Sequence, residues 1–153
     1  MKIIKAALED LPIILKLQKL AYISEAKIHN NYSIQPLVQT LEEVEKEFEK
    51  CIILKLLDEQ QKIIGSIRAY EENNRVYIGK LIVHPDYQNK GLGSSLLKTI
   101  EEMYPNKSFE LFTSSKSDKN LWLYKKNGYR KYKRQSTPDG MEFVYLEKLT
   151  TSP

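Results

Sequence analysis

The spacing of apolar residues changes along the chain between helical and strand-like periods. A short apolar segment at 1–6 is followed by leucines and isoleucines at helical spacing over 8–27. Turn-forming residues occupy 28–36, after which Thr40 and Glu43 form a capping-box pattern. The first third of the sequence therefore predicts one strand, a helix, a loop and a second helix.

The middle of the chain reads as three consecutive strands. Apolar and β-branched residues concentrate at 51–57, 62–70 and 75–84, and short polar segments separate these runs. Asp, Gln and Asn in the connecting segments suit tight turns. We expect an antiparallel meander here.

The last third alternates between the two kinds of element. Apolar residues form a helical stripe over 91–103, and a strand is expected at 109–113. A second helix is expected at 117–127, ahead of two β-rich stretches at 129–134 and 141–146. Strands and helices in this order predict an α+β fold of three layers with one mixed sheet.

Length and composition favour a single folded domain, which we place at residues 2–150. The chain has 153 residues, 41% hydrophobic and 29% charged, a balance typical of a globular domain and unlike a disordered chain. No apolar run approaches the ~20 residues that span a bilayer. The N-terminus lacks the apolar core of a signal peptide, so we expect a cytoplasmic protein without a membrane segment.

Cysteine and histidine are scarce, and we therefore predict no metal. Cys51 lies in an apolar run, where a buried small side chain is favoured over a nucleophile, and His29 and His84 are far apart. The formal net charge is a modest +4. The basic and aromatic segment GYRKYKR at 128–134 leaves RNA association open as an alternative, although a solvated strand has the same alternation and we do not expect a nucleic-acid partner.

The segment LIVHPDYQNKGLGSSLL at 81–97 has the features of a phosphate-binding turn. An apolar strand meets Pro85, and Gly91 and Gly93 then open a helix. A helix N-terminus presents unpaired N–H groups, and glycines allow close approach of a pyrophosphate. Lys90 could add positive charge. The pattern lacks GxxxxGK[ST] and the third glycine of a dinucleotide fingerprint.

Two motifs resemble those of one enzyme family. The run QNKGLG after VHPDY resembles the acetyl-CoA motif of GNAT-type N-acetyltransferases, and NLWLYKKNGY at 120–129 is similar to a downstream helix of that family. The resemblance implies a mixed, mostly antiparallel, splayed sheet of about seven strands flanked by about four helices. It also implies that acetyl-CoA enters between the fourth and fifth strands.

The resemblance further implies roles for individual residues. The backbone of 81–83 would bind pantetheine, N–H groups of 89–94 would hold the pyrophosphate, and Tyr124 would protonate the departing thiolate. Ser117 stands where the family often has Asn, and Asn120 follows three residues later. Ser117 also suits a helix cap, and Tyr124 also suits simple packing on the helix face. The expected cofactor-binding residues are Leu81, Ile82, Val83, Gln88, Asn89, Lys90, Gly91, Leu92, Gly93, Ser94, Ser95, Ser117, Asn120 and Tyr124.

A general base must take a proton from the attacking amine. Glu110 is the first candidate, by resemblance, with Glu71, Glu72 and Glu25 as alternatives. Lys80 stands where many relatives carry an acidic residue, which indicates either a site for an acidic group of the acceptor or an opening to solvent. For acceptor recognition, the location of the residues in the family points to Tyr22, Glu25, Tyr32 and Arg68, with His29 and Gln39 nearby.

These features predict an acetyl-CoA-dependent N-acetyltransferase. The acetyl group would pass to a primary amine of a small molecule or peptide by direct attack in a ternary complex. An acyl-CoA-binding module of the same fold without efficient turnover is the main alternative. A homodimer is compatible with the sequence, and the acceptor is not specified by it.

Overall fold

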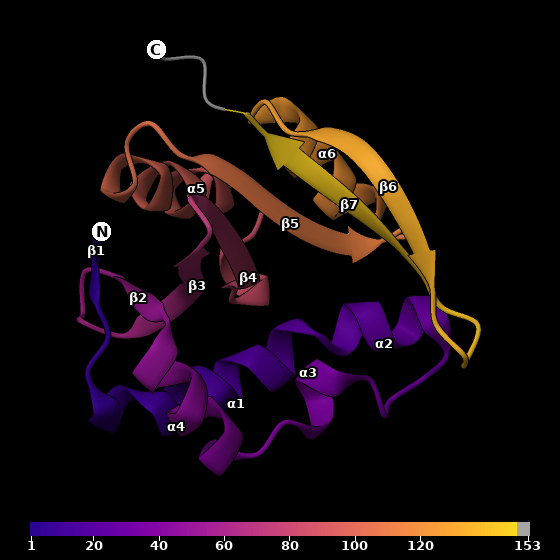
Figure 1. Ribbon diagram of the computed structural model, residues 1–153. Coiled ribbons are helices and arrows are strands. Elements are labelled where there is room, and N and C mark those ends of the chain that lie inside the picture. Colours follow the sequence, from indigo (N-terminus) through magenta and orange to yellow (C-terminus); the bar gives the residue numbers. More distant parts are fainter. Residues whose placement is uncertain (150–153) are drawn as a thin grey trace.

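A seven-stranded sheet with strand order β1-β2-β3-β4-β5-β7-β6 forms the centre of the protein, in a computed structural model that describes residues 1–149 (Figure 1). The strands are β1 (Lys2–Lys5), β2 (Ile52–Leu57), β3 (Ile63–Glu72), β4 (Arg75–Val83), β5 (Ser108–Ser114), β6 (Arg130–Ser136) and β7 (Glu142–Lys148). Neighbouring strands are antiparallel except β4 and β5, which are parallel. The expected mixed, mostly antiparallel sheet is confirmed. Thr150, the last residue of the predicted domain, lies outside the described residues.

Helices cover both faces of this sheet (Figure 1). They are α1 (Leu11–Ala21), α2 (Ile23–His29), α3 (Gln35–Val38), α4 (Leu41–Lys50), α5 (Leu92–Met103) and α6 (Asp118–Lys126), with short 3-10 segments at Leu8–Asp10 and Pro85–Tyr87. The expected first helix is divided at Tyr22, and α3 is a single turn that begins at the end of the expected loop and continues past it. No helix among residues 1–149 is long and apolar enough to cross a membrane.

Local signals explain where several elements begin. Thr40 Oγ1 accepts a hydrogen bond from the Glu43 backbone N–H at 3.2 Å, and Glu43 Oε1 accepts one from the Thr40 N–H at 2.9 Å. This capping box starts α4 at the position that the sequence predicts. Pro36 occupies the first turn of α3, where its missing N–H costs no helical hydrogen bond.

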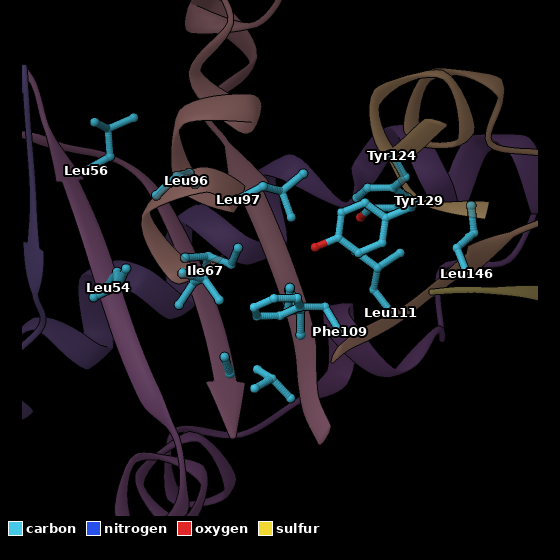
Figure 2. Packing of buried hydrophobic residues seen from close by; sticks show 14 of the residues in the cluster. Leu54, Leu56, Ile67, Leu96, Leu97, Phe109, Leu111, Tyr124, Tyr129 and Leu146 are labelled. Carbon is cyan, nitrogen blue, oxygen red and sulfur yellow. The ribbon is translucent and has the colours of Figure 1, made fainter. Parts of the chain in front are cut away.

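Two apolar clusters hold the layers together. The larger one joins α5 and α6 to the sheet, and Figure 2 shows ten of its members labelled: Leu54, Leu56, Ile67, Leu96, Leu97, Phe109, Leu111, Tyr124, Tyr129 and Leu146. The smaller one packs α1 and α4 against the opposite face, with Cys51 at its edge. Burial raises the pKa of the Cys51 thiol, which suits a packing role better than a nucleophilic one.

The edge strand β6 carries the basic and aromatic segment of the sequence. Every residue of β6 is exposed, as expected for a solvated strand. Arg130 pairs with Glu147 and Arg134 with Glu142, so part of the positive charge is neutralised within the protein.

The parallel strands β4 and β5 separate after a short contact, as the resemblance implied. Their register runs only from Arg75 opposite Ser108 to Tyr77 opposite Glu110, after which β5 continues beside β7. On its other side, β4 has a bulge. Arg68 lies opposite Gly79 and Ser66 opposite Ile82, so two β4 residues face one residue of β3. The gap between β4 and β5 positions the site described next.

Candidate functional site

Two cavities open where β4 and β5 diverge. The first cavity, of about 270 Å³, is lined by Ala21, Tyr22, Ser24, Glu25, Leu81, Ile82, Val83, Tyr87, Gln88, Asn89, Gly91, Leu92, Gly93, Ser94, Lys119, Asn120, Trp122, Leu123 and Lys126. The second cavity, of about 750 Å³, is lined by Tyr22, Glu25, His29, Ser33, Ile34, Gln35, Pro36, Ile78, Gly79, Lys80, Leu81, Phe112, Thr113, Ser114, Asn120, Tyr124, Thr137, Pro138, Asp139, Met141 and Phe143. Both share Tyr22, Glu25, Leu81 and Asn120, so the cavities meet at these residues.

The N-terminus of α5 forms one wall of the first cavity. Gly91 precedes the helix with a φ of 79°, a left-handed conformation that glycine adopts without strain. The first helical hydrogen bond runs from the Ser95 N–H to the Gly91 oxygen at 3.1 Å. The N–H groups of 92–94 therefore have no partner within the helix, and their residues line the cavity. This wall suits an anion such as a pyrophosphate.

Helix α6 supplies a further wall through four residues that the sequence analysis did not single out. Lys119, Trp122, Leu123 and Lys126 recur at helical spacing and line the first cavity. The two lysines bring positive charge to a cavity that already presents free N–H groups. Gly93 lets the helices approach, since a Cβ there would lie 3.0 Å from Leu123 Cδ2. The spacing of lysines on one helix face is the signal that could have revealed this wall.

Three expected cofactor-binding side chains point elsewhere. Lys90 Nζ lies over the Tyr87 ring, and Ser95 Oγ donates to the Gly91 oxygen at 3.2 Å. Ser117 is buried and lines neither cavity. Gln88 does line the first cavity, where its Nε2 donates to the Val83 oxygen and its Oε1 accepts from a lysine of α6. Most of the 81–94 segment is thus brought to one cavity through its backbone.

A fixed carboxylate stands where the cavities meet. Glu25 Oε1 accepts hydrogen bonds from Ser117 Oγ at 2.7 Å and Asn120 Nδ2 at 3.0 Å. Glu25 Oε2 is buried, and no group in the described part of the chain donates a hydrogen bond to it. Ser117 and Asn120, expected as cofactor contacts, hold this carboxylate in place. One oxygen is oriented by the protein, and the other is free to accept a proton or a hydrogen bond.

Two phenols line the second cavity beside Glu25. Tyr124 is 6% exposed, and burial raises its pKa above the usual value, helped by the nearby Tyr22 and Glu25. Among residues 1–149, no group hydrogen-bonds to the Tyr124 hydroxyl. Burial and the Glu25 charge raise the pKa of Tyr22 to about 12. Both hydroxyls are protonated at neutral pH and able to donate.

The structure does not bring Glu110 to either cavity. Its carboxylate accepts from Arg75 Nε at 3.0 Å and from the Tyr132 hydroxyl, at the end of β5 where β4 and β5 are still paired. Glu71 and Glu72 lie at the far end of β3, and Glu71 pairs with a lysine. Of the candidate bases, only Glu25 lines the cavities. The parallel register of β4 and β5 explains why Glu110 is held away.

Two expected acceptor residues also lie outside the cavities. Tyr32 is 54% exposed and lines neither. Arg68 is 3% exposed, and its guanidinium bonds Glu47 at 2.9 Å, Gln18 at 2.6 Å and Gln39 at 3.3 Å. Arg68 therefore connects β3 to α1 and α4 from within the protein. Its position is structural. Lys80, which lines the second cavity, also approaches Glu47, at 3.7 Å.

The turn between β6 and β7 completes the second cavity, and the sequence analysis assigned no site role to it. Thr137, Pro138 and Asp139 line the cavity together with His29 from α2. His29 Nε2 is buried and has no hydrogen-bond partner among the residues that the structure describes. Within residues 1–149, no group of three or more Asp, Glu, His or Cys side chains is placed to hold a metal ion. No local signal in the sequence connects 137–139 with α2.

Comparisons with known proteins agree with this geometry. The family model for the acetyltransferase (GNAT) domain matches residues 23–150. UPF0157 protein YqkA of Bacillus subtilis (strain 168) is 28% identical over 130 residues, which cover 84% of this chain and 37% of YqkA, so the chain spans well under half of that relative. The uncharacterized N-acetyltransferase ycf52 of Pyropia yezoensis is 25% identical over 136 residues, covering 81% of this chain and 75% of that protein. In structure, the PaiA N-acetyltransferase of Thermoplasma acidophilum, crystallised with coenzyme A, has a TM-score of 0.78 at 20% identity, covering 97% of this chain and 98% of that one.

Proposed function

The chain belongs to the acetyltransferase (GNAT) family, in which acetyl-CoA is the co-substrate, and from this premise we propose that it transfers the acetyl group to a primary amine of a small molecule or peptide. The observation that carries the proposal is the meeting of two cavities at Glu25. One cavity has the features of a phosphate site and the other the features of an acceptor site. A group transfer between two bound substrates needs two adjoining sites that bring the reacting atoms together.

Acetyl-CoA would occupy the first cavity. Its pyrophosphate would accept hydrogen bonds from the N–H groups of 92–94, with Lys119 and Lys126 adding positive charge. The pantetheine arm would lie beside 81–83, where β4 has no β5 neighbour. Its amides would then extend the sheet as an added strand does. This placement directs the thioester toward the meeting point of the cavities.

The amine would react from the second cavity by direct attack on the thioester. Its nitrogen forms a bond to the acetyl carbon and loses a proton to Glu25 Oε2, which accepts no hydrogen bond from residues 1–149. The carbon–sulfur bond breaks, and the thiolate takes a proton from the Tyr124 hydroxyl. Tyr124 recovers its proton from Glu25 or water. The products are an acetamide and free coenzyme A.

Two measurements test this proposal. Calorimetry should show binding of acetyl-CoA, and the ligand should raise the melting temperature because it stabilises only the folded protein. A panel of primary amines, read by release of the coenzyme A thiol, should then include an acceptor. Binding without turnover across the panel would favour the acyl-CoA-binding module, whereas absence of binding would contradict the proposed cofactor site.

A further inference from the structure

The wall of the second cavity next to α4 carries a lysine in an unusual conformation. Lys80 belongs to the β4 bulge and has a φ of 45°, in the left-handed region that residues other than glycine rarely adopt. Its side chain is 16% exposed and lines the second cavity. A strained backbone conformation costs free energy and persists only where the surrounding structure enforces it. Such conformations cluster at functional sites.

Charges around Lys80 are not balanced within the protein. Lys80 Nζ lies 3.7 Å from Glu47 Oε1, and the other oxygen of that carboxylate already accepts from Arg68 at 2.9 Å. Gln18 and Gln39, the other partners of Arg68, are neutral. Glu43 is the next acidic group, but its carboxylate caps α4 through Thr40. Two cations therefore share one close carboxylate.

Two further observations indicate that this side of the cavity favours an anion. Among residues 1–149, no group accepts a hydrogen bond from the buried Arg68 Nε, so one donor of the two cations is unpaired. Burial lowers the pKa of Lys80 and the nearby Arg68 charge lowers it further, against the opposing effect of Glu47. A bound anion would offset this cost.

We propose that Lys80 binds a carboxylate of the acceptor, so that the acceptor is an amino acid or a similar amine that carries a carboxylate. The inference rests on the proposed transfer reaction and names the acceptor class for it. The amine would face Glu25 on one side of the second cavity, and the carboxylate would face Lys80. Phe112, Met141 and Phe143 line the same cavity and suit an apolar side chain. Opposite charges placed at two points of one cavity select for a zwitterion.

Asp139 provides the competing possibility of a second cation site. It lines the cavity as an exposed residue and bonds Thr137. An acceptor held by Glu25 and Asp139 would be a diamine. Lys80 is more buried than Asp139, and a buried charge is less screened by solvent. An acceptor with a carboxylate that faces Lys80 is therefore favoured over a diamine that faces Asp139.

Matched acceptors test the inference. L-phenylalanine is compared with phenethylamine, and ε-aminocaproate with pentylamine, since each pair differs in the carboxylate alone; cadaverine is the diamine. In at least one pair, kcat/KM for the amine that carries the carboxylate should exceed that for its carboxylate-free partner by about tenfold to a hundredfold. Lys80→Met should remove this preference and Lys80→Arg should retain it. Lys16→Met, at an exposed position of α1, is the control that should leave the ratio unchanged.

A binding measurement separates this inference from the transfer reaction. N-acetyl-L-phenylalanine and N-acetyl-ε-aminocaproate are titrated into the protein with coenzyme A, and at least one should bind about tenfold more weakly to Lys80→Met than to the wild type. Such binding without turnover of any amine would overturn the transfer reaction and leave the carboxylate site standing. Turnover that favours cadaverine or the carboxylate-free amines, or a preference that survives in Lys80→Met, would overturn the carboxylate site and leave the transfer reaction standing.

Discussion

Replacing Glu25 by glutamine tests the proposed proton acceptor with little change in shape. The amide oxygen can still accept from Ser117 and Asn120, which hold Oε1 at 2.7 and 3.0 Å. Each of these bonds loses its charged acceptor, at a cost of about 1 kcal/mol. Removing a buried charge whose Oε2 has no partner offsets part of this cost. The free energy of unfolding should therefore change by about 2 kcal/mol or less.

The effect on turnover should be much larger than the effect on stability. A positioned general base contributes about 10²–10⁴-fold, which corresponds to about 3–5 kcal/mol of activation free energy. The initial rate of thiol release, measured with an active amine at saturating acetyl-CoA, should fall by this factor. Calorimetry should show nearly unchanged affinity for acetyl-CoA, since the proposed pyrophosphate site is formed by α5 and α6.

Glu110→Gln is the matched control, because the same substitution is made at the other candidate base. Glu110 is held by Arg75 and is 13% exposed, so its replacement should lower the free energy of unfolding by about 1–3 kcal/mol. Its rate of thiol release should stay close to that of the wild type. A wild-type rate in Glu25→Gln together with a large loss in Glu110→Gln would refute the reasoning from the cavities.

Three further substitutions test other parts of the site. Gly91→Asp should abolish acetyl-CoA binding in calorimetry, because the new carboxylate repels the pyrophosphate. Gly91→Ala has the same backbone strain and should still bind acetyl-CoA. Equal affinity of the two variants for acetyl-CoA would contradict the proposed pyrophosphate site. Tyr124→Phe should keep acetyl-CoA binding and lower kcat by about 10²–10⁴-fold, and an unchanged kcat with chemistry limiting would reduce Tyr124 to a packing residue. Arg68→Met should lower the free energy of unfolding by about 2–4 kcal/mol in a denaturant titration, since Glu47 loses its guanidinium partner; an unchanged midpoint would show that Arg68 is not structural.

Local sequence signals were enough to predict the order of most elements. The Thr40 capping box starts α4, and Gly91 opens α5 in the left-handed conformation that its position requires. These features depend on residues within a few positions of one another, so they can be recognised along the chain. The split of the first helix at Tyr22 and the single turn α3 were not predicted, since tertiary packing rather than local preference decides such short segments.

The cofactor segment was predictable for the same local reason. Residues 81–94 form one strand, turn and helix start, and the cofactor role that we propose for them depends mainly on backbone N–H groups. The side chains of Lys90 and Ser95 were expected there but contact neighbouring residues instead. Backbone geometry follows the local pattern more closely than the direction of a flexible side chain does.

Which carboxylate reaches the cavities was decided only by the tertiary structure. Glu25 is held by Ser117 and Asn120, which lie 92 and 95 positions further along the chain, and Glu110 is tied to Arg75 by the register of two parallel strands. The sequence by itself determined the periodicity, the caps and the glycine-containing turn that opens α5. Contacts between distant segments depend on strand register and helix packing, which no short stretch of residues encodes.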